Sequence, residues 1–450
     1  MHKSFACGLV TLAIWIGGVN LLGADGPIPA RVFRHSAVNG QVYCAVILKA
    51  DVLPKDSVTR QHLILIDTSA SQVGEHRQQS LAVLQSLLKS LPEKDRVRLF
   101  AVDLRAEALD EGFNDVHSPA VASAVERLKL RVPLGATNLE AVLRTAMQSA
   151  TDLPTDITYI GDGMSTADLL EVAELRSLVS DLRQRRIPMH SFGVGSQRNM
   201  QMLGVLAQQT GGFVTLDPQM IAADAEVKAE KTKSGKLAKD IARVNRGAAE
   251  RAVEQGKALA AALKAPIYFP TELRITPPEI SLLPADALPV RNDRETIYLV
   301  HGNVPDKTIL VMVDSVGGTT LEWKLEPVEQ PGATFLPVMI GQLETTRGLT
   351  NPLAGMTLFH LAQSDFSDNI TAMAQRAGQA LQTGDFIQAR KISQMVTEAD
   401  PNNEAGRVLR KAIEQLKPKS TKPQGQKAGP ANSKSDVKPG AATSPEKGPN

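Results

Sequence analysis

The chain has 450 residues, enough for about two to four domains, and its 42% hydrophobic and 22% charged residues exclude a collagen, a whole-chain coiled coil and a wholly disordered protein. A formal net charge of +2 and an aromatic share of 4% do not favour nucleic-acid binding, so we expect no nucleic-acid partner. Two cysteines exclude a disulfide framework and a cysteine-rich metal site.

The first 24 residues have the pattern of a signal peptide. Lys3 gives a positive start, and the run from Phe5 to Ala24 holds no charged side chain. We expect cleavage after Ala24 and export to the periplasm, the cell surface or the medium. An uncleaved membrane anchor is the alternative, because the run is long enough to span a bilayer. No later run has the ~20 apolar residues that a bilayer requires, so we expect no transmembrane helix after cleavage.

Between residues 61 and 218 the hydrophobic pattern alternates between strands and helices. We expect strands at 62–66, 95–102, 156–160, 187–194 and 212–216, and helices around 84–91, 118–130, 138–150, 167–185 and 198–209. This alternation predicts an α/β fold with a doubly wound, mostly parallel sheet, which is Rossmann-like.

The regions around this domain differ in composition. The sequence before it contains a predicted strand at 42–53, and the sequence after it contains five consecutive predicted strands without helices, which indicate a small sandwich. The predicted regions are a signal peptide (1–24), an N-terminal β segment (25–60), the α/β domain (61–218), a basic helical linker (219–264), a β-sandwich-like segment (265–330), a helical region (331–416) and a disordered Lys- and Pro-rich tail (417–450).

Oxygen-bearing side chains gather where the α/β pattern predicts one edge of the sheet. Asp67, Ser69 and Ser71 follow the strand at 62–66, and Asp162 follows the strand at 156–160. Thr137 lies in a loop that can fold over both. Ligands bind outside the carboxyl ends of parallel strands, and hard oxygen donors suit Mg²⁺, Ca²⁺ or Mn²⁺. The sequence therefore predicts a divalent-cation site here, although polar caps of turns and helices would use the same residue types.

This pattern resembles the metal-ion-dependent adhesion site of the von Willebrand factor type A family. The matching residues are Asp67, Ser69, Ser71, Thr137 and Asp162 with Gly163. The resemblance implies that the two serines and the threonine bind Mg²⁺ directly and that the two aspartates act largely through water. Two departures are Ala70, where the family usually has glycine, and Gln72, where methionine is common.

The resemblance also bears on the flanking regions. A type A domain has neighbouring termini, so it can be inserted into the sandwich, with 42–53 pairing against strands from 267–325; inter-α-trypsin-inhibitor heavy chains offer a loose parallel. Residues 370–403 resemble one tetratricopeptide repeat, in the positions of Ala377, Gly384, Ala389 and Pro401. A helical hairpin packed on a neighbour is the alternative.

Together these features predict an exported, non-enzymatic adhesion or scaffolding protein. A divalent cation at the site would bind a protein partner through an Asp or Glu carboxylate of that partner. One alternative is a metal-dependent hydrolase, for which no His or Glu is evident beside the three segments as a general base. The other is a structural cell-envelope protein with a vestigial metal site.

Overall fold

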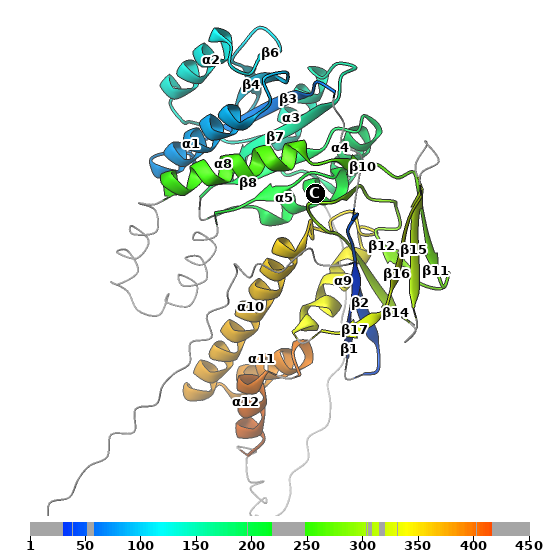
Figure 1. Cartoon of the computed structure of the whole chain (residues 1–450). Coiled ribbons are helices and arrows are strands. Elements are labelled where there is room, and N and C mark those ends of the chain that lie inside the picture. The colour runs from blue at the N-terminus through cyan, green and yellow to red at the C-terminus, as the bar shows by residue number, and fades with distance from the viewer. Residues whose placement is uncertain are drawn as a thin grey trace, which may run out of the picture.

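The computed structural model describes residues 30–415 except 38, 52–57, 196, 218–247, 303, 305–307, 315–319, 331 and 402. The expected signal peptide, the expected tail and most of the expected linker lie outside the described residues. In Figure 1 an α/β domain lies above a β-rich domain, and three helices extend away from their junction.

A seven-stranded sheet forms the centre of the α/β domain, in the order β5-β4-β3-β7-β8-β9, with β6 also paired to β4. Five strands run parallel: β3 (Gln61–Asp67), β4 (Arg96–Val102), β7 (Thr155–Gly161), β8 (Met189–Gly193) and β9 (Val214–Thr215). The short strands β5 (Ala106–Ala108) and β6 (Asn114–Asp115) are antiparallel to β4. The predicted doubly wound, mostly parallel sheet is confirmed.

Helices cover both faces of this sheet, which explains why β3 is a continuous apolar run. Leu63 and Leu65 of β3 pack in one core and Ile64 and Ile66 in the other. The first core includes residues of α3 (Leu139–Gln148), α4 (Val172–Gln184) and α5 (Met200–Thr210); the second includes residues of α1 (Glu75–Ser90) and α2 (Pro119–Leu130). Every residue of β3 is buried as a result.

The helix α8 (Ala248–Lys264) differs from the predicted linker, because it is part of the α/β core. Ala252, Leu259 and Leu263 lie in the same core as α1, and the two helices run side by side in Figure 1. Their approach is close: a Cβ on Gly256 would lie 2.6 Å from the Val83 carbonyl oxygen. Small and apolar residues on one face of α8 therefore make it a sixth helix of the domain rather than a solvated connection.

The β-rich domain is built from both sides of the α/β domain. One sheet has the order β12-β14-β2-β1-β17, and β2 pairs antiparallel with β14, which confirms the predicted insertion. Its strands are β1 (Arg31–Ser36), β2 (Val42–Leu48), β12 (Leu282–Leu283), β14 (Thr296–Gly302) and β17 (Pro327–Glu329). The other strands are β10 (Ile267–Tyr268), β11 (Glu272–Thr276), β13 (Val290–Arg291), β15 (Ile309–Asp314) and β16 (Thr320–Leu325). β11, β15 and β16 form a second sheet, and apolar residues of both sheets share one core.

Helices complete the chain after the sandwich: η1 (Ala333–Phe335), α9 (Leu336–Glu344), α10 (Met356–Gln382), α11 (Phe386–Ala399) and α12 (Glu404–Gln415). α10 begins against the two domains, where Leu358 lies in an α/β core and Phe359 in the core beneath the five-stranded sheet. It then leads away from them, and α11 and α12 pack on its far part (Figure 1). A helical hairpin is present at 370–403, whereas its tetratricopeptide character stays a prediction.

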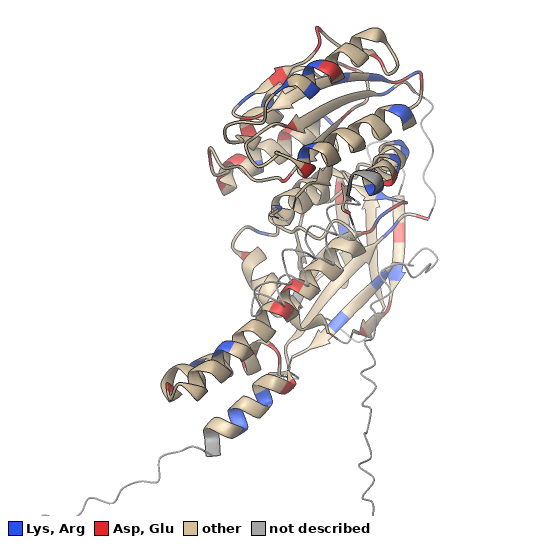
Figure 2. Cartoon of the chain, turned by 90° about the vertical axis from the view of Figure 1, so that its left-hand side faces the viewer, with Lys and Arg blue, Asp and Glu red and all other residues tan. Residues whose placement is uncertain are grey.

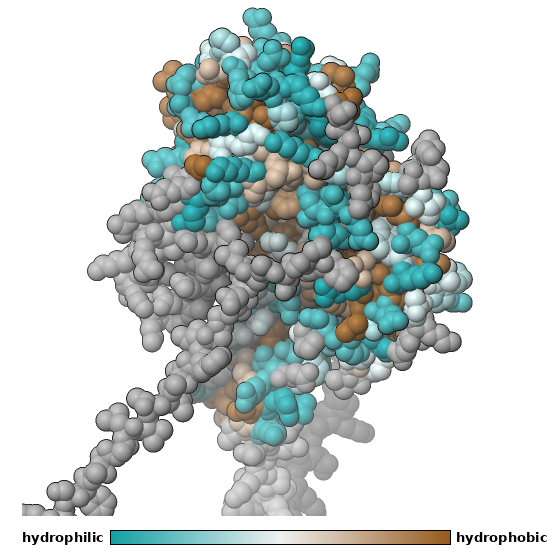
Figure 3. All heavy atoms as spheres, viewed as in Figure 1, coloured by the Kyte–Doolittle hydropathy of each residue, from teal (hydrophilic) through white to brown (hydrophobic). Residues whose placement is uncertain are grey.

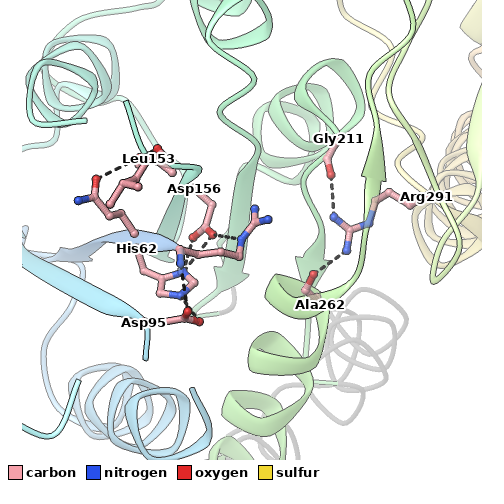
Figure 4. Close-up of polar contacts among 10 residues, drawn as sticks. His62, Asp95, Leu153, Asp156, Gly211, Ala262 and Arg291 are labelled. Carbon is pink, nitrogen blue, oxygen red and sulfur yellow. Dashed lines mark hydrogen bonds and ion pairs between the residues drawn. The ribbon is translucent and has the colours of Figure 1, made fainter. Parts of the chain in front are cut away.

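Two buried arginines of the β-rich domain fix it to the α/β domain. Arg294 donates from Nη2 to the Ala207 carbonyl oxygen at 2.9 Å and from Nε to that of Gly212 at 2.6 Å. Arg291 donates to the carbonyl oxygens of Gly211 and Ala262 at 2.8 and 2.7 Å (Figure 4). The guanidinium groups thus donate to carbonyl oxygens near the carboxyl ends of α5 and α8, where backbone donors within a helix run out.

Candidate functional site

The predicted site lies at the carboxyl edge of the parallel sheet. β3 ends at Asp67 and β7 at Gly161, so the loops that carry the two aspartates leave neighbouring strands side by side. Two backbone hydrogen bonds bring the third loop over them: Leu134 N donates to Thr68 O at 2.9 Å, and Ala70 N donates to Gly135 O at 3.0 Å. Three separate segments thus meet at one place.

The five side chains singled out from the sequence lie together there. Ser69 Oγ is 3.0 Å from Ser71 Oγ, and Ser71 Oγ donates to Asp162 Oδ2 at 2.5 Å. On the other side of the cluster, Thr137 Oγ1 donates to Asp67 Oδ1 at 3.4 Å. The structure brings all five residues together, and their role as metal ligands stays a prediction.

The two carboxylates of the cluster are buried and form no ion pair with another described residue, although the charge of the buried Arg77 reaches Asp67. Asp67 is 0% and Asp162 4% exposed, and neither forms an ion pair with a Lys, Arg or His of the described residues. Burial raises the pKa of Asp67, and the charge of Asp162 raises it further, while hydrogen bonds from Tyr159 and Ser69 oppose the shift. Buried charges in proteins are normally paired or bound to metal, so this pair calls for a cation.

Tyr159 is a site residue that sequence reasoning missed. Its phenol is buried and donates to Asp67 Oδ2 at 2.6 Å, while Gly163 N donates to the phenol oxygen at 3.4 Å. Burial, followed by the charge of Asp67, raises the pKa of Tyr159 well above its usual value, so the phenol keeps its proton. Tyr159 thereby connects the two aspartate loops. The sequence shows only that a tyrosine, whose side chain ends in a polar hydroxyl, stands two residues before Gly161 in an apolar strand.

Gln72 occupies the position where the sequence departs from the family pattern. Its Nε2 donates to Ser71 Oγ at 3.1 Å and to Asp162 Oδ2 at 3.2 Å. Its Oε1 is buried and has no hydrogen-bond partner among the described residues. An orphaned acceptor beside two carboxylates and three hydroxyls fits a hydrated divalent cation, whose shell water would donate to it.

His76 corrects the expectation that no histidine lies beside the three segments. It stands in the first turn of α1, and its Nδ1 lies 3.1 Å from the Ser71 carbonyl oxygen. Because a carbonyl only accepts, Nδ1 carries the proton in this contact, and the neutral ring keeps its lone pair on Nε2. One sign of this contact is present in the sequence. His76 follows Ser71 by five residues, across the turn from the loop into α1, and this turn brings the chain back to the site.

Close backbone approach makes Gly161 a structural requirement of the site. A Cβ at this position would lie 2.5 Å from both the Asp67 Cβ and the Tyr159 phenol oxygen. Gly163 adds a second constraint, with φ at +72° and Leu203 packed against it. The strand-to-loop turn therefore sets how near the two aspartates come.

Side-chain chemistry restricts the metal that the cluster could hold. In the described part of the chain, no group of three or more His, Cys, Asp or Glu residues gathers as a metal site. The cluster itself offers two carboxylates and three hydroxyls, all of them oxygen. Such a set fits Mg²⁺, Mn²⁺ or Ca²⁺ and does not fit zinc, which prefers nitrogen and sulfur.

Comparisons with known proteins give a curated relative and several solved structures that are similar to this chain. A curated relative, an uncharacterized protein of Synechocystis, is 28% identical over 180 residues, which are 39% of this chain and 41% of that protein. This chain thus matches less than half of that relative's length. Among solved structures, a von Willebrand factor type A protein from Catenulispora acidiphila has a TM-score of 0.43 at 13% identity, covering 87% of this chain and 91% of that one. The ArnB paralog VWA2 from Sulfolobus acidocaldarius has a TM-score of 0.37 at 14% identity, covering 86% and 94%.

The family model for the von Willebrand factor type A domain matches residues 61–216. The match begins with the first residue of β3 and ends one residue after β9, so the family model covers the whole sheet described above. Residues 61–216 of this chain are a von Willebrand factor type A domain.

Proposed function

We propose that this protein is an exported, non-enzymatic adhesion or scaffolding protein that binds its partner through a divalent cation. Domains of this family generally mediate protein–protein interactions. The observation that carries the metal-dependent part is the pair of buried carboxylates, Asp67 and Asp162, neither of which forms an ion pair with another described residue; Arg77 acts on Asp67 only through its charge at longer range. A bound cation supplies the charge that this pair lacks.

Each residue of the cluster has a definite part in the proposal. Ser69, Ser71 and Thr137 would hold the cation directly, and Asp67 and Asp162 would hold its water molecules. When bound, Mg²⁺ supplies an electrophilic position to which an outside carboxylate can bind. The chain's own contribution is to keep the donors in place: Tyr159 fixes Asp67, and Gln72 fixes Asp162.

Export rests on the targeting pattern at residues 1–24, which lie outside the described residues. Among the residues that the structure describes, no helix is long and apolar enough to cross a membrane.

One observation favours the hydrolase alternative: His76 lies beside Ser71. We favour the binding function because the buried polar groups here bond to one another and hold the loops. The alternatives separate experimentally. Hydrolysis of para-nitrophenyl phosphate or para-nitrophenyl acetate that requires Mg²⁺ and falls in His76→Ala would support the hydrolase.

The proposed function is tested by capture from an envelope extract with the immobilised full chain. We expect a partner to be retained in Mg²⁺, released by chelator and not retained by Asp162→Asn. Calorimetry should show Mg²⁺ binding to the parent chain and none to the variant. Retention that is equal in Mg²⁺ and chelator would support a structural envelope protein with a vestigial site instead.

A further inference from the structure

Large apolar side chains surround the candidate metal site in solvent. They come from four loops at the carboxyl edge of the sheet, and we call the following six residues the apolar rim: Val73 (55% exposed), Leu104 (53%), Val132 (76%), Leu134 (73%), Met164 (38%) and Leu169 (79%). Figure 3 shows apolar atoms exposed among hydrophilic ones on the visible face of the type A domain. Exposed apolar side chains that gather at one place mark an interaction surface.

The distribution of these residues within the domain is uneven. Between residues 61 and 217, nine large apolar side chains are exposed, six of which form the rim. Leu153, 43% exposed, precedes β7 at the opposite, amino edge of the sheet. The cores meanwhile bury the apolar residues of every parallel strand. Exposure at the rim is therefore a property of the site edge and not of the whole domain.

The rim loops are held by the same contacts that build the site. Leu134 N donates to Thr68 O at 2.9 Å, so the backbone of this rim residue is fixed beside Ser69. Asn138 N donates to Asp103 O, next to Leu104, and Ala167 N donates to Thr137 O, each at 3.1 Å. Because hydrogen bonds hold these backbones in place, the apolar side chains form a preorganised surface. Such a surface loses little conformational entropy when a partner binds to it.

We propose that the apolar rim and the oxygen cluster together recognise a protein segment in which an Asp or Glu is flanked by large apolar residues. The inference rests on the proposed function and specifies the partner. The cluster takes the carboxylate, and the neighbours of that acid in its chain reach the rim. Binding of a carboxylate alone would not let the site select one acidic partner over another. Apolar contacts on both sides of the acid give the interface its selectivity.

The charges near the rim favour a protein segment over an anionic membrane. Glu75, Glu107 and Asp168 are exposed beside it, the exposed Arg105 is a single basic residue next to Leu104, and Arg131 is paired with Asp103 and Glu107. Figure 2 shows acidic and basic residues interspersed over the described part of the type A domain. Adsorption to anionic lipid relies on clustered basic residues, so this edge suits a partner with one acid among apolar residues.

The test is selection from a phage-displayed library of random peptides on the full chain in Mg²⁺, with elution by chelator. We expect enriched peptides to contain Asp or Glu with large apolar residues on both sides. A synthetic peptide of that type should bind about five- to tenfold more tightly than the same peptide with serine flanks. Equal binding of the two peptides, or selection of acids with polar flanks, would overturn the inference.

Matched variants separate the rim from the metal site. Leu134→Ser should weaken the apolar peptide about fivefold and leave Mg²⁺ affinity unchanged, whereas Leu153→Ser, at the opposite edge, should change neither. If Mg²⁺ does not bind or chelator does not release the peptide, the proposed function itself fails. If Mg²⁺ and acid are required but Leu134→Ser has no effect, only the rim is wrong.

Two other occupants are tested with the same variants. Sedimentation with phosphatidylserine vesicles would assign the rim to lipid if binding requires Mg²⁺ and falls in Leu134→Ser. Analytical ultracentrifugation would assign it to a second copy of the chain if Mg²⁺ drives dimerisation that Leu134→Ser abolishes. Either result would overturn the proposal of a protein segment, and we expect neither.

Discussion

His62 Nδ1 lies 2.8 Å from Asp156 Oδ1 in the buried amino edge of the type A sheet (Figure 4). The other ring nitrogen of His62, Nε2, lies 3.2 Å from Asp95 Oδ2. Burial alone would lower the pKa of His62, but the charges and hydrogen bonds of Asp156 and Asp95 outweigh it and raise the pKa to about 9. The imidazolium therefore persists in the core at neutral pH.

This pair predicts a loss of stability in mild alkali. A pKa raised in the folded state stabilises the fold fully below the unfolded value of 6.5, and the contribution disappears as pH rises through about 9. We expect the free energy of unfolding in urea to fall by roughly 2–3 kcal/mol over this range. His62→Gln should be less stable at pH 6 and nearly independent of pH there; an unchanged alkaline slope in the variant would refute the assignment.

The lowered pKa of His190 predicts a loss of stability in acid, the opposite direction of pH change from His62. It is fully buried, and burial together with the charges of Arg291 and Arg60 lowers its pKa well below the usual value. A lowered pKa of a base stabilises the fold above the unfolded value of 6.5, and that contribution is lost as pH falls. Unfolding at pH 5 should therefore be easier than at pH 6.5, and His190→Asn should reduce this acid slope in the same urea experiment.

Asp162→Asn should stabilise the metal-free protein while removing its response to Mg²⁺. The change removes one of two like charges in a buried place, and the Gln72 amide can turn so that Oε1 accepts from the new amide. We expect roughly 1 kcal/mol of added stability without metal. The parent chain should gain about 2.7 kcal/mol at a Mg²⁺ concentration a hundred times its dissociation constant, and the variant none. Thermal unfolding with and without Mg²⁺ measures both effects.

Tyr159→Phe should weaken the site because it leaves Asp67 Oδ2 buried without its donor. Such a loss costs about 1–3 kcal/mol of stability, and we expect Mg²⁺ affinity by calorimetry to change as well, since Asp67 is freed to move. Tyr298→Phe is the matched control: its phenol accepts from Leu288 N at 2.7 Å in the β-rich domain. It should reduce stability without touching Mg²⁺ affinity; equal effects of the two variants on Mg²⁺ would argue against a role for Tyr159.

Gly161→Ala should disrupt the turn on which both aspartates depend. The new methyl group would lie 2.5 Å from the Asp67 Cβ and the Tyr159 oxygen, so one of the two loops must move. We expect several kcal/mol of destabilisation or loss of Mg²⁺ binding. Gly112→Ala, where no atom lies within 4 Å, is the control and should behave like the parent.

The sequence predicted the sheet and the gathering of the five oxygen-bearing residues because both follow from local patterns. A continuous apolar run such as Leu63–Ile66 marks a strand buried on both faces, and parallel strands place their carboxyl ends on one edge. Tyr159 could not be found in this way, and Gln72 stood out only as a departure from the family pattern, without a contact assigned to it. Their contacts with Asp67 and Asp162 depend on how near β3 and β7 approach, which no residue pattern expresses.

The role of α8 was missed for a related reason. Its helical character was evident, but a helix rich in Ala, Lys and Glu does not reveal its packing partner. Burial of Ala252 and Leu263 depends on the groove beside α1, and Gly256 allows the close contact. The strand β1 lies within the predicted N-terminal β segment but was not predicted as a separate strand. Its pairing with β2 is a local hairpin, whereas its pairing with β17 joins residues almost 300 positions apart, which no local pattern reveals.

The insertion of the type A domain after β2 has a mechanical consequence for an adhesive protein. The chain leaves β2 at Leu48 for that domain and returns through α8 to β10 at Ile267, so β14, the partner of β2, is reached only later in the chain. A pull on the metal site therefore enters the β-rich domain at β2 and at β10, two strands of different sheets. The load is shared between the five-stranded sheet and the β10–β13 pair, which Arg291 of β13 ties to the carbonyl oxygens of Gly211 and Ala262.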